Sequence, residues 1–124
     1  MICFRFHSDG SGKSMGFKIK YITLQSFTAC GGTFSNSSGI VLSPYFPNTY
    51  PELADCVYHI SQPSGTYFKI TILQMDIDCQ GTISDFIEFR DGYFGNSPLM
   101  GQFCGNGDMI PSNFMSTKNH MRIR

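Results

Sequence analysis

The five cysteines are the residues of this chain with the most distinctive chemistry. No two of them have the C-x-x-C spacing that zinc ribbons and thiol redox sites use. Cysteines this far apart favour a disulfide framework, which forms in an oxidising compartment. Any four of them allow three different pairings, and their spacing alone does not choose among these. The cysteines are Cys3, Cys30, Cys56, Cys79 and Cys104.

Residues that could support catalysis form no recognisable constellation. The chain contains no G-x-S-x-G motif, no glycine loop of the kind that cradles phosphate and no recognisable pair of catalytic acids. The histidines are scattered at His7, His59 and His120, and none lies in a zinc-protease helix motif. We therefore predict no enzyme activity and expect the histidines to be surface or strand residues.

Composition limits the range of partners. Nine Lys plus Arg balance nine Asp plus Glu in 124 residues, so no global field favours nucleic acid or an anionic membrane surface. No apolar run is long enough to insert into a membrane, and the first residues do not resemble a secretion signal. We expect an extracellular fragment whose signal lies upstream. Asn36-Ser37-Ser38 is an acceptor sequence for N-glycosylation, which fits that compartment.

The elements that must position these residues are predicted to be short strands. Apolar and polar residues alternate in several places, which is typical of strands half buried against a core. Turn residues such as Gly31-Gly32 and Asp91-Gly92 separate the runs. We predict an all-β sandwich of antiparallel strands, its core packed with phenylalanine and tyrosine. The alternating apolar sets are Ile2, Phe4, Phe6; Phe17, Ile19, Tyr21; and Ile87, Phe89.

Five motifs in order from Cys30 onward resemble the CUB domain family. The longest, residues 39–51, is similar to the family string G-x-I-x-S-P-x-Y-P-x-x-Y-P. The others are Cys30-Gly31-Gly32-Thr33-Phe34, Cys56-Val57-Tyr58-His59-Ile60, Asp85-Phe86-Ile87-Glu88-Phe89-Arg90-Asp91-Gly92 and Phe103-Cys104-Gly105. The resemblance implies a CUB-type jelly-roll β-sandwich with two disulfides, Cys30 with Cys56 and Cys79 with Cys104. Cys3 is left over, as an unpaired thiol or, alternatively, as one half of an intermolecular bridge.

The residues before Cys30 resemble the closing hairpin of a CUB domain, and 119–124 resemble the strand that leads into such a hairpin. We therefore interpret residues 1–21 as the C-terminal hairpin of a preceding CUB domain and 22–29 as a linker. Residues 30–124 would then be a CUB domain lacking its last hairpin. Tandem CUB domains with so short a linker are similar to those of a multi-CUB endocytic receptor.

The resemblance also implies a calcium site that accepts a lysine side chain from a ligand. Asp78 and Asp85 match two of the family's three carboxylates, and Asp9 in the N-terminal segment matches the third. Oxygen ligands of this kind suit calcium. Asp78 stands where the family has glutamate, and Cys79 follows it at once, so solvated loop acids are an equal alternative. We hypothesise that the N-terminal hairpin folds back and brings Asp9 to the pair, although it could instead swap between two chains.

The resemblance implies a binding module and not an enzyme. We expect it to capture protein ligands through lysine side chains, to contact neighbouring CUB domains, and to stay at the cell surface through its parent protein. Binding of nucleic acid and direct insertion into a membrane are not expected. The alternative is an interaction module of a secreted protease of the tolloid or complement type.

Overall fold

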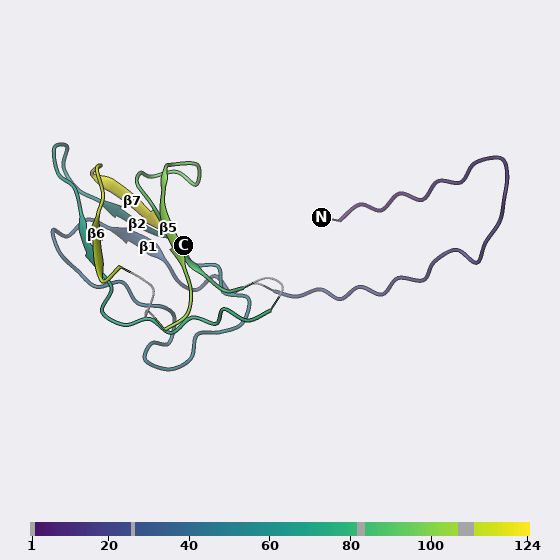
Figure 1. Ribbon diagram of the computed structural model, residues 1–124, viewed down its shortest axis with the longest axis horizontal. Helices are drawn as coiled ribbons and strands as arrows, with labels where there is room; N and C mark the ends of the chain where they lie inside the picture. The colour runs from purple at the N-terminus through teal and green to yellow at the C-terminus, as the bar shows by residue number, and fades with distance from the viewer. Residues whose placement is uncertain (1, 26, 82–83, 107–110) are drawn as a thin grey trace.

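The fold is built from strands (Figure 1). It is seen in a computed structural model that describes residues 2–25, 27–81, 84–106 and 111–124. Within these ranges no helix is long and apolar enough to cross a bilayer. The strands are β1 (Gly32–Phe34), β2 (Tyr58–Ser61), β3 (Lys69–Thr71), β4 (Ile87–Arg90), β5 (Leu99–Phe103), β6 (Asn113–Met115) and β7 (His120–Ile123).

The strands form two sheets. In the part of the chain that the structure describes, one has five strands in the order β1-β2-β7-β4-β5, and the other has two, β3 and β6. Every pairing is antiparallel except that of β1 with β2, which is parallel. The all-β sandwich expected from the sequence is confirmed. The expected antiparallel pairing holds between the other strands, whereas β1 pairs parallel with β2, since residues 35–57 carry the chain back to the same end of the sheet before β2 begins.

The core lies between the sheets and follows the two-residue period of the strands. In β7, Met121 and Ile123 are buried, whereas Arg122 between them faces the outside of the five-stranded sheet, beside Glu88. Phe89 of β4 packs edge-on against Phe114 of β6, with ring centroids 5.0 Å apart. Among the described residues, the buried core consists of Tyr58, Phe89, Met121 and Ile123, and ten partly buried hydrophobic residues pack against them.

Two disulfides fasten the sandwich. Cys30 is bonded to Cys56, and Cys79 to Cys104, with sequence separations of 26 and 25 residues. These are the pairs that the family resemblance implied. A loop of this length, once closed, stabilises a fold by about 3 kcal/mol in the chain-entropy description. Cys3 is free and exposed.

Residues 2–25 extend away from the sandwich as two arms joined by a bend (Figure 1). The arms contact each other at Phe6 and Phe17, whose ring centroids are 5.3 Å apart. No strand is formed in either arm, so the prediction of strands at the alternating runs of residues 2–6 and 17–21 is wrong for this structure. An alternating pattern makes one face of a segment apolar, but a strand also needs a backbone partner.

Candidate functional site

The candidate site is the acidic loop, residues 76–85, which connects the second sheet to β4. Thr82 and Ile83 lie outside the described residues. The first half of the loop is fixed by an isolated antiparallel bridge, in which Ile77 and Gly105 exchange two backbone hydrogen bonds of 3.0 and 2.7 Å. The Cys79–Cys104 disulfide adds a covalent attachment directly beside Asp78. Three acids of the loop, Asp76, Asp78 and Asp85, are exposed.

Tyr50 joins the two ends of the acidic loop. Its hydroxyl donates a hydrogen bond of 2.7 Å to Oδ2 of Asp85 and accepts one of 3.1 Å from the backbone N–H of Asp78. The backbone N–H of Asp85 also donates to the carbonyl oxygen of Asp78, at 3.2 Å. The structure therefore brings Asp78 and Asp85 together, with one tyrosine between the carboxylate of one and the backbone of the other.

The environment of Tyr50 keeps its hydroxyl protonated beside the carboxylates of Asp78 and Asp85. Partial burial raises the pKa of Tyr50, and the hydrogen bond to Asp85 and the negative charges of Asp85 and Asp78 raise it further. The N–H of Asp78 opposes this by favouring the phenolate, but the net direction is upward. Tyr50 thus remains a hydrogen-bond donor at neutral pH and orients the Asp85 carboxylate.

A calcium ion takes about six to eight oxygen ligands. Oδ1 of Asp78 already accepts a hydrogen bond of 2.9 Å from the N–H of Gln80, and Oδ2 of Asp85 is held by Tyr50. Within the described ranges no group of three His, Cys, Asp or Glu side chains could hold a metal ion. The residues present therefore do not make a complete calcium site.

Asp9 is not brought to this pair. It lies in the projecting N-terminal segment, where its Oδ1 accepts a hydrogen bond of 3.2 Å from the N–H of Ser11. The structure does not place the N-terminal segment on residues 30–124 as the hypothesis of folding back requires. The Asx-type turn at Asp9 instead forms the bend between the two arms.

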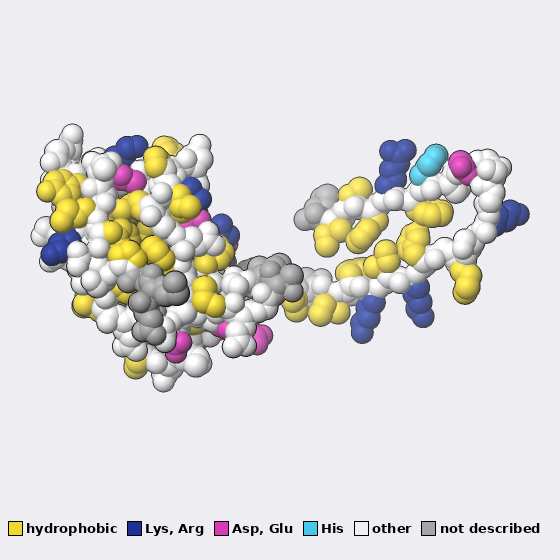
Figure 2. All heavy atoms as spheres, viewed as in Figure 1, with side chains coloured by type: hydrophobic (Ala, Val, Ile, Leu, Met, Phe, Trp, Pro, Cys, Tyr) yellow, Lys and Arg dark blue, Asp and Glu magenta, His cyan; other side chains and the backbone are white. Residues whose placement is uncertain are grey.

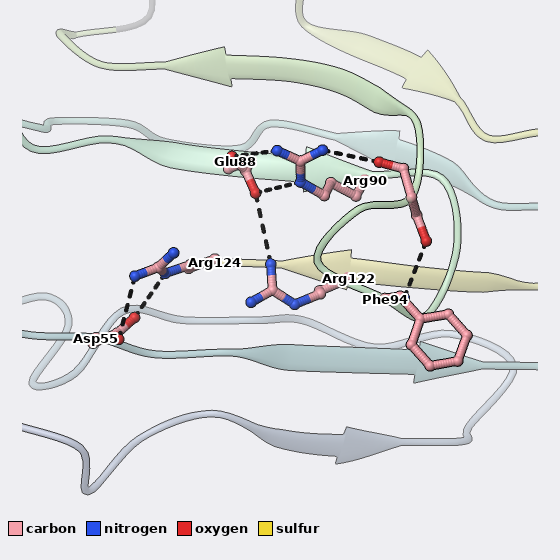
Figure 3. A network of polar contacts seen from close by, with 7 residues as sticks. Asp55, Glu88, Arg90, Phe94, Arg122 and Arg124 are labelled. Carbon is pink, nitrogen blue, oxygen red and sulfur yellow. Dashed lines mark hydrogen bonds and ion pairs between the residues drawn. The ribbon is translucent and has the colours of Figure 1, made fainter.

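A second polar cluster lies on the outer face of the five-stranded sheet (Figure 3). Glu88 is buried and accepts hydrogen bonds of 2.7 and 3.1 Å from the guanidinium of Arg90, while Arg122 lies 3.6 Å away. The bond from Arg90 is the main reason that the pKa of Glu88 is lowered. Arg124 makes a separate ion pair with Asp55 at 2.8 Å. These groups are paired with one another and support the sheet.

Asp91, at the end of β4, is a buried structural acid. Its carboxylate accepts hydrogen bonds from the N–H and hydroxyl of Thr117 at 3.0 and 2.6 Å, and from the N–H of Lys118 at 3.0 Å. Burial alone would raise its pKa, but these three bonds and the positive charge of Lys118 together outweigh burial, and the net pKa is lowered. Asp91 thereby ties the turn after β4 to the loop before β7.

Sequence reasoning missed the roles of Tyr50 and Asp91. Both residues stand in the motifs that carry the family resemblance, and that position was the available signal. What the motif could not give was the partner, because Asp85 lies 35 residues from Tyr50 and Thr117 lies 26 residues from Asp91. Asn36, the glycosylation candidate, is exposed, and its backbone carbonyl accepts a hydrogen bond from Gln62.

Comparison with known proteins places these features in a family. The family profile described as "CUB domain" matches residues 30–124. Dog cubilin is 38% identical over 126 residues, covering 97% of this chain and 3% of cubilin. Human tolloid-like protein 1 is 40% identical over 96 residues, covering 77% of this chain and 9% of that protein. The chain thus spans a small part of the length of either relative.

Solved structures of CUB domains also resemble this fold. The CUB1-EGF-CUB2 domains of rat MASP-1 align with a TM-score of 0.62 at 26% identity, covering 76% of this chain and 33% of that one. CUB domains are non-catalytic interaction modules, so these findings support an extracellular protein-interaction module. With the fold, both disulfides and residues 30–124 all in agreement, the chain belongs to the CUB domain family.

Proposed function

We propose that this chain is the ligand-binding module of a multi-CUB endocytic receptor, and that Asp78 and Asp85 receive a lysine ammonium from a protein ligand. The supporting observation is that Tyr50 hydrogen-bonds both the carboxylate of Asp85 and the backbone N–H of Asp78, beside the Cys79–Cys104 disulfide, and that both aspartates are exposed. Tyr50 occupies Oδ2 of Asp85, whereas Oδ1 accepts no hydrogen bond from the described residues. An ammonium group has three donors and suits two such acceptors.

Preorganisation is what such a pair needs to bind a cation. An ion pair between exposed groups contributes only about 0–1 kcal/mol, partly because two mobile side chains must be fixed. Here the first half of the loop is already fixed by the bridge at Ile77 and by the disulfide, so less entropy is lost on binding. We expect weak binding of a single lysine and tighter binding of a protein that also contacts the surrounding surface.

Chemical-shift mapping tests the proposal. Nα-acetyl-lysine amide should move the amide signals of Asp78, Gln80 and Asp85 in the ¹⁵N-labelled chain. The same compound with its Nε atom acetylated should not, because it lacks the charge. Shifts that are equal for the two compounds, or that fall outside the acidic loop, would contradict the proposal.

Calcium dependence is a finer part of this proposal. Asp78 and Asp85 would supply two carboxylates, and Asp9 would have to approach them from its place in the N-terminal segment. Isothermal titration with calcium chloride should then release or absorb heat in the native chain, and Asp85→Asn should abolish it, whereas Asp76→Asn should not. Absence of heat at millimolar calcium would show that the chain does not bind calcium there. Lysine binding would then be tested separately by the chemical-shift experiment.

Glycosylation of Asn36 and attachment to a cell surface through the parent protein complete the proposal. Digestion of secreted material with an amidase for N-glycans should lower its mass and convert Asn36 to Asp. An unchanged mass would show that Asn36 is not modified.

The alternative is an interaction module of a secreted protease. It is favoured by the 40% identity to human tolloid-like protein 1 over 96 residues. The coding sequence on either side of this chain distinguishes the two. Further CUB domains support the receptor, and a protease domain supports the alternative.

A further inference from the structure

Asn36 follows the edge strand β1 and lies beside a partly exposed aromatic ring. In the sequence, Asn36-Ser37-Ser38 is the one N-x-S/T tripeptide, so an N-glycan on this chain would be attached there. Phe34, two residues earlier, is the last residue of β1 and is 37% exposed. An aromatic side chain therefore lies two residues from the attachment point of a sugar.

Phe34 is held in place by the neighbouring strand. Its register partner in the parallel pair is Ile60 of β2, and its ring stacks on Tyr58, with centroids 6.2 Å apart and an angle of 28° between the planes. Tyr58 is buried and donates its hydroxyl to the carbonyl oxygen of Leu42 at 2.8 Å. The ring of Phe34 is thus supported by a buried side chain, while more than a third of the residue stays accessible.

A hollow in the surface joins Phe34 to the acceptor residue. Exposed hydrophobic side chains alone do not identify a ligand, since they also run along residues 2–25 (Figure 2). The hollow differs from that segment because its lining includes a point of covalent attachment. Its polar lining residues are Asn36 and Ser38, and its apolar ones are Phe34, Ile40, Val41 and Ile60.

The bend that carries Asn36 is fastened through its backbone. Nε2 of Gln62 donates to the carbonyl oxygens of Ser35 and Asn36 at 2.7 and 2.8 Å. Gln62 is itself paired with Asn119, whose carbonyl accepts its N–H at 2.9 Å and whose side-chain amide donates to its carbonyl at 2.8 Å. The side-chain amide of Asn36 makes no hydrogen bond to the described residues. The bend is therefore fixed, and the nitrogen that bears an N-linked sugar is not used by the fold.

The first sugar of an N-glycan suits this surface. The substituents of a β-linked N-acetylglucosamine are equatorial, so each face of its ring presents C–H groups, and its acetamido group ends in a methyl. The face of an aromatic ring carries partial negative charge and attracts such C–H groups, and apolar area removed from water adds to the attraction. Because the sugar is tethered beside the ring, the contact does not cost the freedom of two separate molecules.

We propose that the first N-acetylglucosamine of an N-glycan on Asn36 packs on Phe34 and covers the hollow, and that this contact stabilises the folded domain. The inference rests on the proposed glycosylation of Asn36 and is independent of lysine binding at the acidic loop. A contact comparable to that of an aromatic pair should raise the folding equilibrium constant by about two- to tenfold.

The stability of matched forms of the chain tests the packing. Secreted chain with high-mannose glycans is trimmed by an endoglycosidase that leaves one N-acetylglucosamine on Asn36, and chain of the same sequence made in bacteria, with its disulfides formed, carries none. Urea unfolding should give the one-sugar form a folding equilibrium constant about two- to tenfold larger. Equal constants overturn the packing but leave glycosylation intact, whereas secreted chain whose mass shows no sugar overturns both.

Nuclear magnetic resonance detects the contact itself. With ¹³C-labelled N-acetylglucosamine on Asn36, nuclear Overhauser effects should join its ring protons or its methyl group to the ring protons of Phe34. The methyl signal should also lie upfield of its position in urea-unfolded chain, because it lies near an aromatic face. Absence of these effects in the folded, glycosylated chain overturns the packing, and this measurement needs no substitution.

Two leucine variants distinguish contact with Phe34 from a general effect of the sugar. The ratio of folding equilibrium constants with and without the sugar is measured in each variant, so that the cost of the substitution itself cancels. Phe34→Leu should bring this ratio close to one. Phe94→Leu, at a 66% exposed phenylalanine that does not line the hollow, should keep the native ratio. The same ratio in both variants would overturn the proposed contact with Phe34.

Discussion

Replacement of Asp91 by Asn should destabilise the domain although it preserves the size and shape of the side chain. The carboxylate accepts three hydrogen bonds, two at Oδ2 from Thr117 and one at Oδ1 from Lys118. An amide has one accepting oxygen, so at least one N–H would face an NH₂ group. Asp91 is 8% exposed, which leaves little room for water to replace the lost bond.

The expected cost is about 2–3 kcal/mol. A hydrogen bond to a charged group contributes about 1.5–3 kcal/mol, and the remaining bonds weaken when the charge is removed. Urea unfolding followed by circular dichroism measures this difference, with Asp76→Asn as a control that removes the same charge from an exposed loop. The control should change the free energy of unfolding by less than about 0.5 kcal/mol.

The pH dependence identifies the charge as the cause. Because the pKa of Asp91 is lowered in the folded state, its contribution is complete above the unfolded value of about 3.9. The contribution is lost as the pH falls through the lowered folded value. The native chain and Asp91→Asn should therefore converge in stability as the pH falls below about 3.9. A difference under about 0.5 kcal/mol at neutral pH, or one that persists in acid, would refute this reasoning.

Two further predictions concern the opening motif and the tyrosine of the acidic loop. Gly31→Ala should lower the free energy of unfolding by about 3 kcal/mol or more, because Gly31 has φ +86° and a Cβ there would collide with the carbonyl oxygen of Val57. The control Gly39→Ala, where a Cβ would meet nothing within 4 Å, should lower it far less. Equal losses in urea unfolding would contradict this reasoning. Asp85→Asn should lower the pKa of Tyr50 toward its ordinary value, but the pKa should stay above that value because burial also raises it. An unchanged pKa in a ¹³C-detected titration would show that the hydrogen bond to Asp85 has no effect on Tyr50.

The class of fold could be predicted from the sequence, whereas the pairing of the strands could be seen only in the structure. Alternation at Ile87 and Phe89 identified β4, and both side chains contribute to the core. The same kind of alternation at residues 17–21 did not produce a strand, because pairing depends on a backbone partner that periodicity cannot reveal. The parallel pairing of β1 was missed for the same reason.

The candidate site was predictable in part. Asp78 and Asp85 were expected to act together, and the structure brings them together at the hydroxyl of Tyr50. Asp9 was expected beside them on the strength of a motif, but a motif specifies local chemistry and not where a tethered segment goes. The role of Tyr50 depends on a contact between distant residues and could be recognised only from the folded chain.

Isothermal titration of a lysine-bearing peptide tests the proposed function most directly. Its affinity is measured side by side for the native chain, Asp85→Asn and Asp76→Asn. If Asp78 and Asp85 receive the ammonium group, Asp85→Asn weakens binding by about tenfold and Asp76→Asn by less than about twofold, although both remove one negative charge. Equal losses for the two variants would mean that the peptide responds only to overall charge, and that the acidic loop held by Tyr50 is not a binding site.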